Sequence, residues 1–96
     1  MEEVLLKLNN KGHGAFIAMD GEEQVGEMQV GIKDHILTAF HTEVIPKAEG
    51  KGWAKKLLNA MVDHARKNEY KVIPLCPYVL AQFKRHPEEF ADIWKK

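Results

Sequence analysis

The chain has 96 residues, a length that fits one domain, residues 1–96, with a modest hydrophobic core. Fourteen Lys and Arg balance fourteen Asp and Glu, so the formal net charge is zero. That balance argues against a general nucleic-acid or membrane binder, because such proteins usually carry a basic excess. One cysteine, Cys76, excludes an internal disulfide and a CxxC pair.

The start of the chain, Met1-Glu2-Glu3, is acidic and lacks the basic and apolar regions of a signal peptide. No stretch is long and apolar enough to cross a membrane. We therefore expect a cytoplasmic protein. Metal binding is not expected, because the histidines show no HxH or HxxxH spacing. They are His13, His35, His41, His64 and His86.

The first half of the chain reads as strands joined by short turns. Residues 3–9 suit an edge strand or a short helix, and the dipeptide Asp20-Gly21 is typical of a hairpin turn. A second short turn is expected at Lys33-Asp34. The other strands are expected at residues 14–19, 24–33 and 35–45, the last being rich in β-branched and aromatic residues.

The apolar period then changes to three and four residues, which predicts an amphipathic helix that ends near Asn68. A short strand follows at residues 70–75. Strand–helix–strand units are parallel with a right-handed crossover, so the ends of strands 35–45 and 70–75 should share one sheet edge. Ligands of open sheets bind at that edge. The apolar positions of the helix are Trp53, Leu57, Leu58, Met61, Val62 and Ala65.

The last segment predicts two helices. Pro77 suits the first position of a helix that runs to about His86, and Pro87 ends it. Pro87-Glu88-Glu89 reads as a second helix start, with an apolar face of Phe90, Ile93 and Trp94. The predicted class is α+β, a mostly antiparallel sheet with a strand–helix–strand unit and terminal helices.

The turn between strand 35–45 and the helix contains Gly50 and Gly52. Glycines there let the backbone approach a ligand, and free N–H groups at a helix start attract anions. The Walker pattern is excluded, because Trp53 stands where it needs Ser or Thr. The GxGxxG pattern is excluded, because Lys55 stands where it needs a third glycine. The alternative is a plain turn with solvated lysines. The lysines concerned are Lys47, Lys51, Lys55 and Lys56.

The stretch from Val44 to Ala54 resembles the CoA-binding motif of the GNAT N-acetyltransferase superfamily, Gln/Arg-x-x-Gly-x-Gly/Ala. Gly52 and Ala54 match it, and Glu49 departs from it. The resemblance extends to residues 41–44, 74–79 and 85–88. It implies the GNAT acyl-CoA N-acyltransferase fold and acetyl-CoA as cofactor, with Glu49 turned from the phosphates. The implied cofactor-binding residues are Val44, Ile45, Lys47, Glu49, Gly50, Lys51, Gly52, Trp53 and Ala54.

Four residues are candidates for the chemistry. Cys76 precedes the helix that starts at Pro77, and a thiol at a helix N-terminus is more reactive than a free one, so it suits an acyl carrier. Its alternative is a buried apolar residue. Tyr78 suits protonation of a departing thiolate, as in many GNAT enzymes, or helix packing. His41 and Glu43 share one strand face and suit a base, whereas Thr42 and Val44 should pack on the other face.

The first hypothesis is an acetyl-CoA-dependent N-acetyltransferase that acts on an unidentified amine. The alternative is a non-catalytic acyl-CoA-binding or sensor module, and a third is a purely structural interaction domain. Larger family members carry extra N-terminal helices near the acceptor site, whereas this chain begins almost directly with strands, which favours the module. Cys76 and Tyr78 favour the enzyme. No nucleic-acid or membrane partner is expected, and the oligomeric state stays open.

Overall fold

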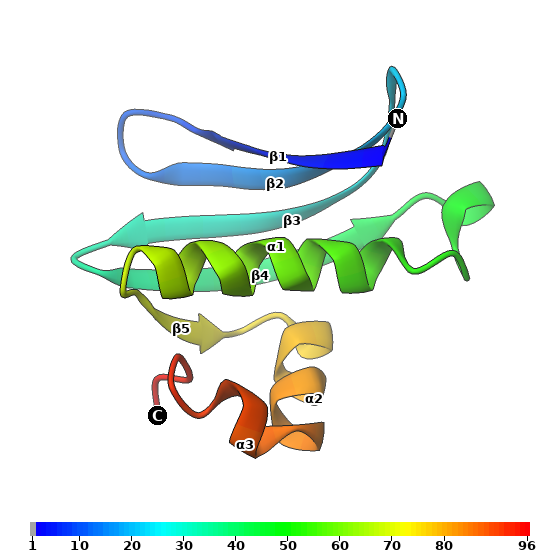
Figure 1. Cartoon of the computed structure of the whole chain (residues 1–96). Coiled ribbons are helices and arrows are strands. Elements are labelled where there is room, and N and C mark those ends of the chain that lie inside the picture. The colour runs from blue at the N-terminus through cyan, green and yellow to red at the C-terminus, as the bar shows by residue number, and fades with distance from the viewer. Residues whose placement is uncertain (1) are drawn as a thin grey trace.

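The computed structural model describes residues 2–96 and has one five-stranded sheet in the order β1-β2-β3-β4-β5 (Figure 1). The first four strands are antiparallel, and β5 is parallel to β4. This arrangement confirms the α+β class. The strands are β1 (Glu2–Leu8), β2 (His13–Asp20), β3 (Glu23–Lys33), β4 (Ile36–Val44) and β5 (Lys71–Pro74). The helices are the 3₁₀ helix η1 (Pro46–Ala48), α1 (Trp53–Lys67), α2 (Pro77–Arg85) and α3 (Pro87–Phe90).

In the first half of the chain, the structure decides between two alternatives at residues 3–9 and corrects the expected start of β4. The first segment is an edge strand, β1, and not a helix. The turn between β3 and β4 consists of Asp34 and His35, which both have positive φ values of 52° and 65°. Two consecutive positive φ values are typical of a tight hairpin turn. The expectation that His35 belongs to the strand was therefore wrong, and β4 begins at Ile36.

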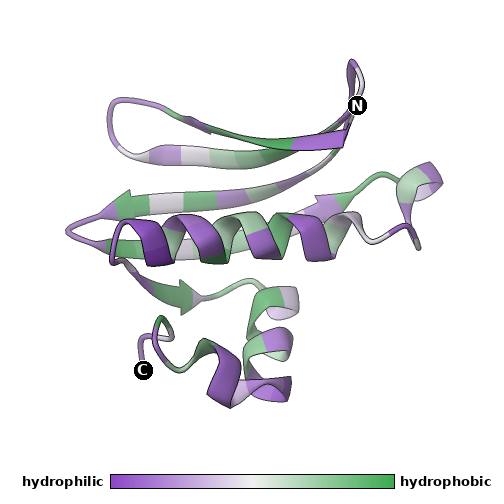
Figure 2. Ribbon diagram, in the orientation of Figure 1, coloured by the Kyte–Doolittle hydropathy of each residue, from purple (hydrophilic) through white to green (hydrophobic). Residues whose placement is uncertain are grey.

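Helix α1 lies along one face of the sheet and forms the core with β2, β3 and β4 (Figure 1). Hydrophilic and hydrophobic residues alternate along it in Figure 2, as expected for an amphipathic helix. The helix ends at Asn68, as predicted. All six apolar positions predicted for its inner face are buried, where they meet Phe16, Met28 and Leu37.

The crossover from β4 through α1 to β5 leaves part of β4 without a neighbour on its β5 side. The parallel pairing begins at Ile36 opposite Lys71 and ends at Ala39 opposite Pro74. Beyond this point β4 continues to Val44, while the other chain segment turns into α2. The N–H of Cys76 still donates to the carbonyl oxygen of Ala39, at 2.8 Å. The end of β4 and the start of α2 therefore border the same region, as the parallel crossover predicts.

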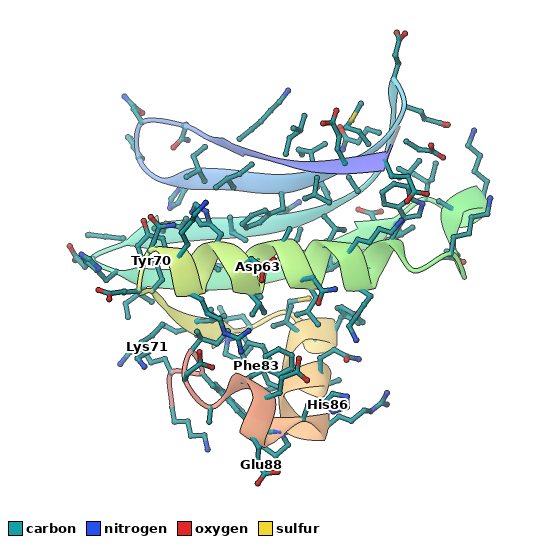
Figure 3. All side chains as sticks on the ribbon, in the orientation of Figure 1. Asp63, Tyr70, Lys71, Phe83, His86 and Glu88 are labelled. Carbon is teal, nitrogen blue, oxygen red and sulfur yellow. The ribbon has the colours of Figure 1, made fainter. Side chains whose placement is uncertain are left out.

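The C-terminal segment is less helical than the sequence suggests. Helix α3 has only four residues, so Ile93 and Trp94 lie outside it, contrary to the expectation. Instead, the N–H of Val72 donates to the Ile93 carbonyl (2.6 Å), and the Lys95 N–H donates to Val72 (2.9 Å). The reason is that the outer edge of β5 needs hydrogen-bond partners. The Phe83 side chain of α2 (Figure 3) stacks on Phe90 of α3, and this contact packs the C-terminal segment against α2.

Candidate functional site

The turn before α1 is held by two glycines in the left-handed backbone region. The φ values are 80° at Gly50 and 84° at Gly52, a conformation that costs little only for glycine. A Cβ added at either position would meet no atom within 4 Å. The backbone conformation therefore requires the glycines, and the space beside them is open to a ligand.

The same turn presents a row of unused backbone N–H groups. Gly52 is the N-cap residue of α1 and has no side chain to cap the helix. The first hydrogen bond of this end runs from Lys56 N–H to the Gly52 carbonyl, at 3.1 Å. Among residues 2–96, no acceptor takes the N–H groups of residues 50–55. These groups lie at the positive end of the α1 dipole, an arrangement that is chemically suited to phosphate oxygens.

A cavity of about 410 Å³ joins this turn to β4 and α2. Its volume is in the range of small-ligand sites. The lining combines the two chain segments that the crossover brings to one edge, so the sequence-based expectation of their meeting is confirmed. The lining residues are Thr42, Val44, Ala48, Glu49, Gly50, Gly52, Trp53, Ala54, Lys55 and Tyr78.

Ile45 and Lys51, which were also expected to bind cofactor, lie beside this cavity without lining it, whereas Glu49 is one of its lining residues. The Ile45 N–H donates to the Val25 carbonyl at 2.9 Å and ends the β4 ladder. Lys51 is exposed on the turn. Glu49, at the rim, is exposed, and its N–H donates to the Pro46 carbonyl at 3.2 Å. The Glu49 backbone thus serves η1, while its side chain has access to solvent.

The four lysines near the turn have different surroundings. The ammonium group of Lys47 lies 2.8 Å from a carboxylate oxygen of Glu23. Lys56 pairs with Glu2 and also lies over the Trp53 ring, 4.5 Å from its centroid. Lys55 alone of the four lines the cavity. The positive charge available to a cavity anion therefore comes from Lys55 and the helix end.

Cys76 is the N-cap residue of α2, as predicted, and is only 1% exposed. Its side chain does not cap the helix. The sulfur lies 3.2 Å from Oγ1 of Thr42, within hydrogen-bond distance. Because Thr42 lines the cavity, the sulfur lies directly behind the cavity wall. The sequence did not predict that Thr42 lines the cavity and contacts Cys76, because its spacing from Val44 indicates only that the two residues share a strand face.

Tyr78 lies in the first turn of α2 and lines the cavity. Partial burial raises the pKa of its phenol, and the nearby Cys76 thiol raises this pKa further. The phenol therefore carries its proton at neutral pH. A protonated hydroxyl in the cavity wall is suited to donate that proton to a developing anion.

His41 and Glu43 lie apart from these residues. Thr42 and Val44 line the cavity, so strand alternation places His41 and Glu43 on the opposite sheet face. Both are exposed, with Nε2 of His41 3.8 Å from Oε1 of Glu43. Glu43 borders a smaller hollow of about 270 Å³, which Glu27 also lines. The structure thus brings together Thr42, Cys76, Tyr78 and the glycine turn, without His41 or Glu43.

Two further properties concern the part of the chain that the structure describes. Residues 2–96 contain no group of three or more His, Cys, Asp or Glu side chains placed to hold a metal ion. No helix in the same residues has both the length and the apolar character needed to span a membrane.

Comparisons with known proteins agree with this architecture. Comparison with curated protein sequences gives no match. The solution structure of a GCN5-like putative N-acetyltransferase from Staphylococcus aureus is similar over 95% of this chain and 87% of that one, at 26% identity and a TM-score of 0.69. The ribosomal-protein-S18-alanine N-acetyltransferase from Escherichia coli shares the fold at 15% identity and a TM-score of 0.64. That match covers 69% of this chain but only 43% of the E. coli enzyme.

The family model described as GCN5-related N-acetyl-transferase matches residues 15–93. This range runs from β2 to the segment that pairs with β5, so it includes the glycine turn and the cavity. The chain therefore belongs to the GCN5-related N-acetyltransferase family.

Proposed function

We propose that this protein binds acetyl-CoA at the glycine turn and transfers the acetyl group to an amine. The observation that carries the proposal is the row of free N–H groups at residues 50–55, which opens into the cavity between β4 and α2. A helix N-terminus with free amides binds phosphate oxygens well, and the pyrophosphate of CoA supplies them. Acetyl-CoA, when bound, supplies an activated acetyl thioester.

The remaining cavity residues fit the less polar part of such a molecule. Val44, Trp53 and Ala54 contribute apolar surface to the lining. Lys55 adds a positive charge at the end where the amides lie. The wall thus offers one cationic side chain and an apolar surface, which suits an anionic group joined to a less polar arm, provided that the exposed Glu49 carboxylate faces solvent.

Tyr78 and Cys76 carry the proposed chemistry. The protonated phenol of Tyr78 is the proton donor for the thiolate that leaves. Cys76 is the candidate acyl carrier, in which the thiol takes the acetyl group in exchange for its proton and later gives it to the amine. Because the sulfur is buried behind Thr42, this role requires the Thr42 side chain to turn aside. The alternative is that Cys76 only supports the wall.

His41 and Glu43 are proposed as bases for an amine that approaches from the other sheet face. Residues of β4 beyond Ala39 have no β5 partner, so the sheet is not closed at this point. An amine between the strands would reach the cavity on one side and these residues on the other. Their exposure keeps them accessible to water, which can relay the proton.

A non-catalytic acyl-CoA-binding module is the second candidate. The observation in its favour is that neither proposed base lines the cavity. Calorimetric titration with CoA and acetyl-CoA tests the binding proposal, and no saturable heat for either would overturn it. Release of free thiol from acetyl-CoA with a library of amines tests transfer. If binding is saturable but thiol is released no faster than in buffer, the protein is a non-catalytic acyl-CoA-binding module.

A further inference from the structure

Strand β1 is an edge strand with a free side along its whole length. It pairs only with β2, and in Figure 1 no element lies beyond it. Its seven residues pair with β2 in one unbroken register, without a bulge or a proline. Edge strands are usually protected by such features. Here the edge is regular and carries Leu5 and Leu8, which are 39% and 41% exposed.

The hydrogen bonds to β2 show which backbone groups face outward. The N–H of Asn9 donates to the carbonyl of His13 at 2.8 Å, which continues the β1–β2 register by one residue beyond the pair of Leu8 and Gly14. Backbone groups alternate in direction along a strand, so those of Lys7, Leu5 and Glu3 also face β2. The outward N–H and C=O groups therefore belong to the even-numbered residues: Glu2, Val4, Leu6 and Leu8.

We propose that β1 pairs with β1 of a second copy of this chain, antiparallel about a twofold axis at Leu5. Val4 then lies opposite Leu6 of the partner subunit, and their outward groups exchange two hydrogen bonds. Glu3 lies opposite Lys7 of the partner subunit, and the symmetry repeats each pair. Two opposite-charge pairs therefore flank a centre in which Leu5 meets Leu5 of the partner subunit.

The charges select this register over its neighbours. The outward groups also allow pairings centred on Val4 or on Leu6. The pairing centred on Val4 places Glu3 opposite Leu5 of the partner subunit. The pairing centred on Leu6 places Lys7 opposite that leucine. Only the pairing centred on Leu5 matches both charges. Glu3 and Lys7 would form a pair without backbone hydrogen bonds, where side chains are closest, so opposite charges there stabilise the pairing.

The apolar side chains support the same partner. A hollow of about 360 Å³ lies beside β1 on the α1 side. Its apolar lining residues are Val4, Leu6, Phe16 and Ala60, and its polar ones are Asp63, His64 and Lys67 of α1. Antiparallel pairing places the partner's apolar residues of β1 along this hollow and extends its apolar row. None of the residues that line the cavity at β4 lies on β1, so dimer formation and acyl-CoA binding are separable.

Charge exchange tests this dimer in the full chain. Sedimentation velocity over a concentration series measures association of the wild type, Glu3→Lys, Lys7→Glu and the double variant. Each single change creates two like-charge pairs and should weaken the dimer by about tenfold or more. The double variant restores both pairs and should dimerise again. An equimolar mixture of the two single variants should form a heterodimer, because each carries the charge that the other needs.

Matched controls reverse charges far from β1. Glu88→Lys on α3 and Lys84→Glu on α2 change the net charge equally and should leave association as in the wild type; Figure 3 shows Glu88 at the end of the molecule away from β1. A wild type that stays monomeric at every concentration would overturn the proposal. Single variants that dimerise as the wild type does, or a mixture that stays monomeric, would overturn it too.

Discussion

The sulfur of Cys76 lies 3.2 Å from the hydroxyl oxygen of Thr42, and this contact connects the start of α2 to the unpaired end of β4. The two residues are 34 positions apart in the chain. Thr42 faces the cavity, while Cys76 lies behind it. A change at either residue therefore alters the wall where the acyl group of the proposed cofactor would lie.

Replacing Cys76 tests the acyl-carrier role. We expect acetyl labelling of the wild type by acetyl-CoA, detected by intact-protein mass spectrometry, and none in Cys76→Ala. The variant also leaves a small void, which should lower the free energy of unfolding by about 1 kcal/mol. Thr42→Val is the matched control: it keeps the thiol and the shape of the wall but removes the hydroxyl. Labelling that persists in Cys76→Ala, or a wild type that is never labelled, would leave Cys76 a supporting role.

Replacing Gly52 tests the phosphate site. An alanine in the left-handed region costs about 1 kcal/mol of stability and places a methyl group beside the free amides. We expect CoA binding to weaken by roughly tenfold or more, as measured by calorimetry. Gly21→Ala is the control, because Gly21 has a φ of 66° in the turn between β2 and β3. Equal loss of affinity in both variants would indicate a general effect of destabilisation and would contradict a site at Gly52.

Replacing Tyr78 with phenylalanine tests the proton donor. The cavity keeps its shape, so CoA affinity should hardly change, whereas the rate of thiol release should fall by roughly a hundredfold. Burial raises the pKa of the Tyr78 phenol above its ordinary value of 10.0. The wild-type contribution should therefore be present at neutral pH and lost only above pH 10. Tyr70→Phe is the control, since Tyr70 packs on His35 and His64. An unchanged rate in Tyr78→Phe would exclude the role.

The pairing of Arg66 with Asp92 predicts a pH-dependent stability. The hydrogen bond from Arg66 Nε to Asp92 Oδ2, at 2.9 Å, lowers the pKa of this carboxyl below its ordinary 3.8. A lowered carboxyl pKa stabilises the fold above that ordinary value, and the stabilisation is lost as the pH falls through the lowered one. Both side chains are partly exposed, so Asp92→Asn should cost no more than about 1 kcal/mol at pH 7.

Urea unfolding of the wild type and Asp92→Asn measures this effect. The difference between them should shrink as the pH falls from about 7 to about 3. Glu22→Gln, in the exposed turn between β2 and β3, is the control and should show a small difference at both values. A difference for Asp92→Asn that stays constant with pH would show that its charge is not the cause.

Local patterns are sufficient for much of the fold and for one end of the site. The three- and four-residue spacing of apolar residues predicts α1 and its buried face, because a helix can bury only one stripe. The parallel crossover follows from the strand–helix–strand order, and it predicts that the glycine turn and Tyr78 meet at one edge. The two glycines indicate a turn with room for a ligand, since few other residues adopt their backbone conformation.

Other features depended on contacts between distant segments. Alternation shows that His41 and Glu43 share a face, but only the packing of α1 decides that the cavity lies on the face of Thr42. The last residues do not form the helix that their spacing predicts, because the backbone of Val72 in β5 hydrogen-bonds with Ile93 and Lys95. Spacing within a segment determines which residues share a face. Which face meets a partner depends on hydrogen bonds and burial that only the folded chain brings together.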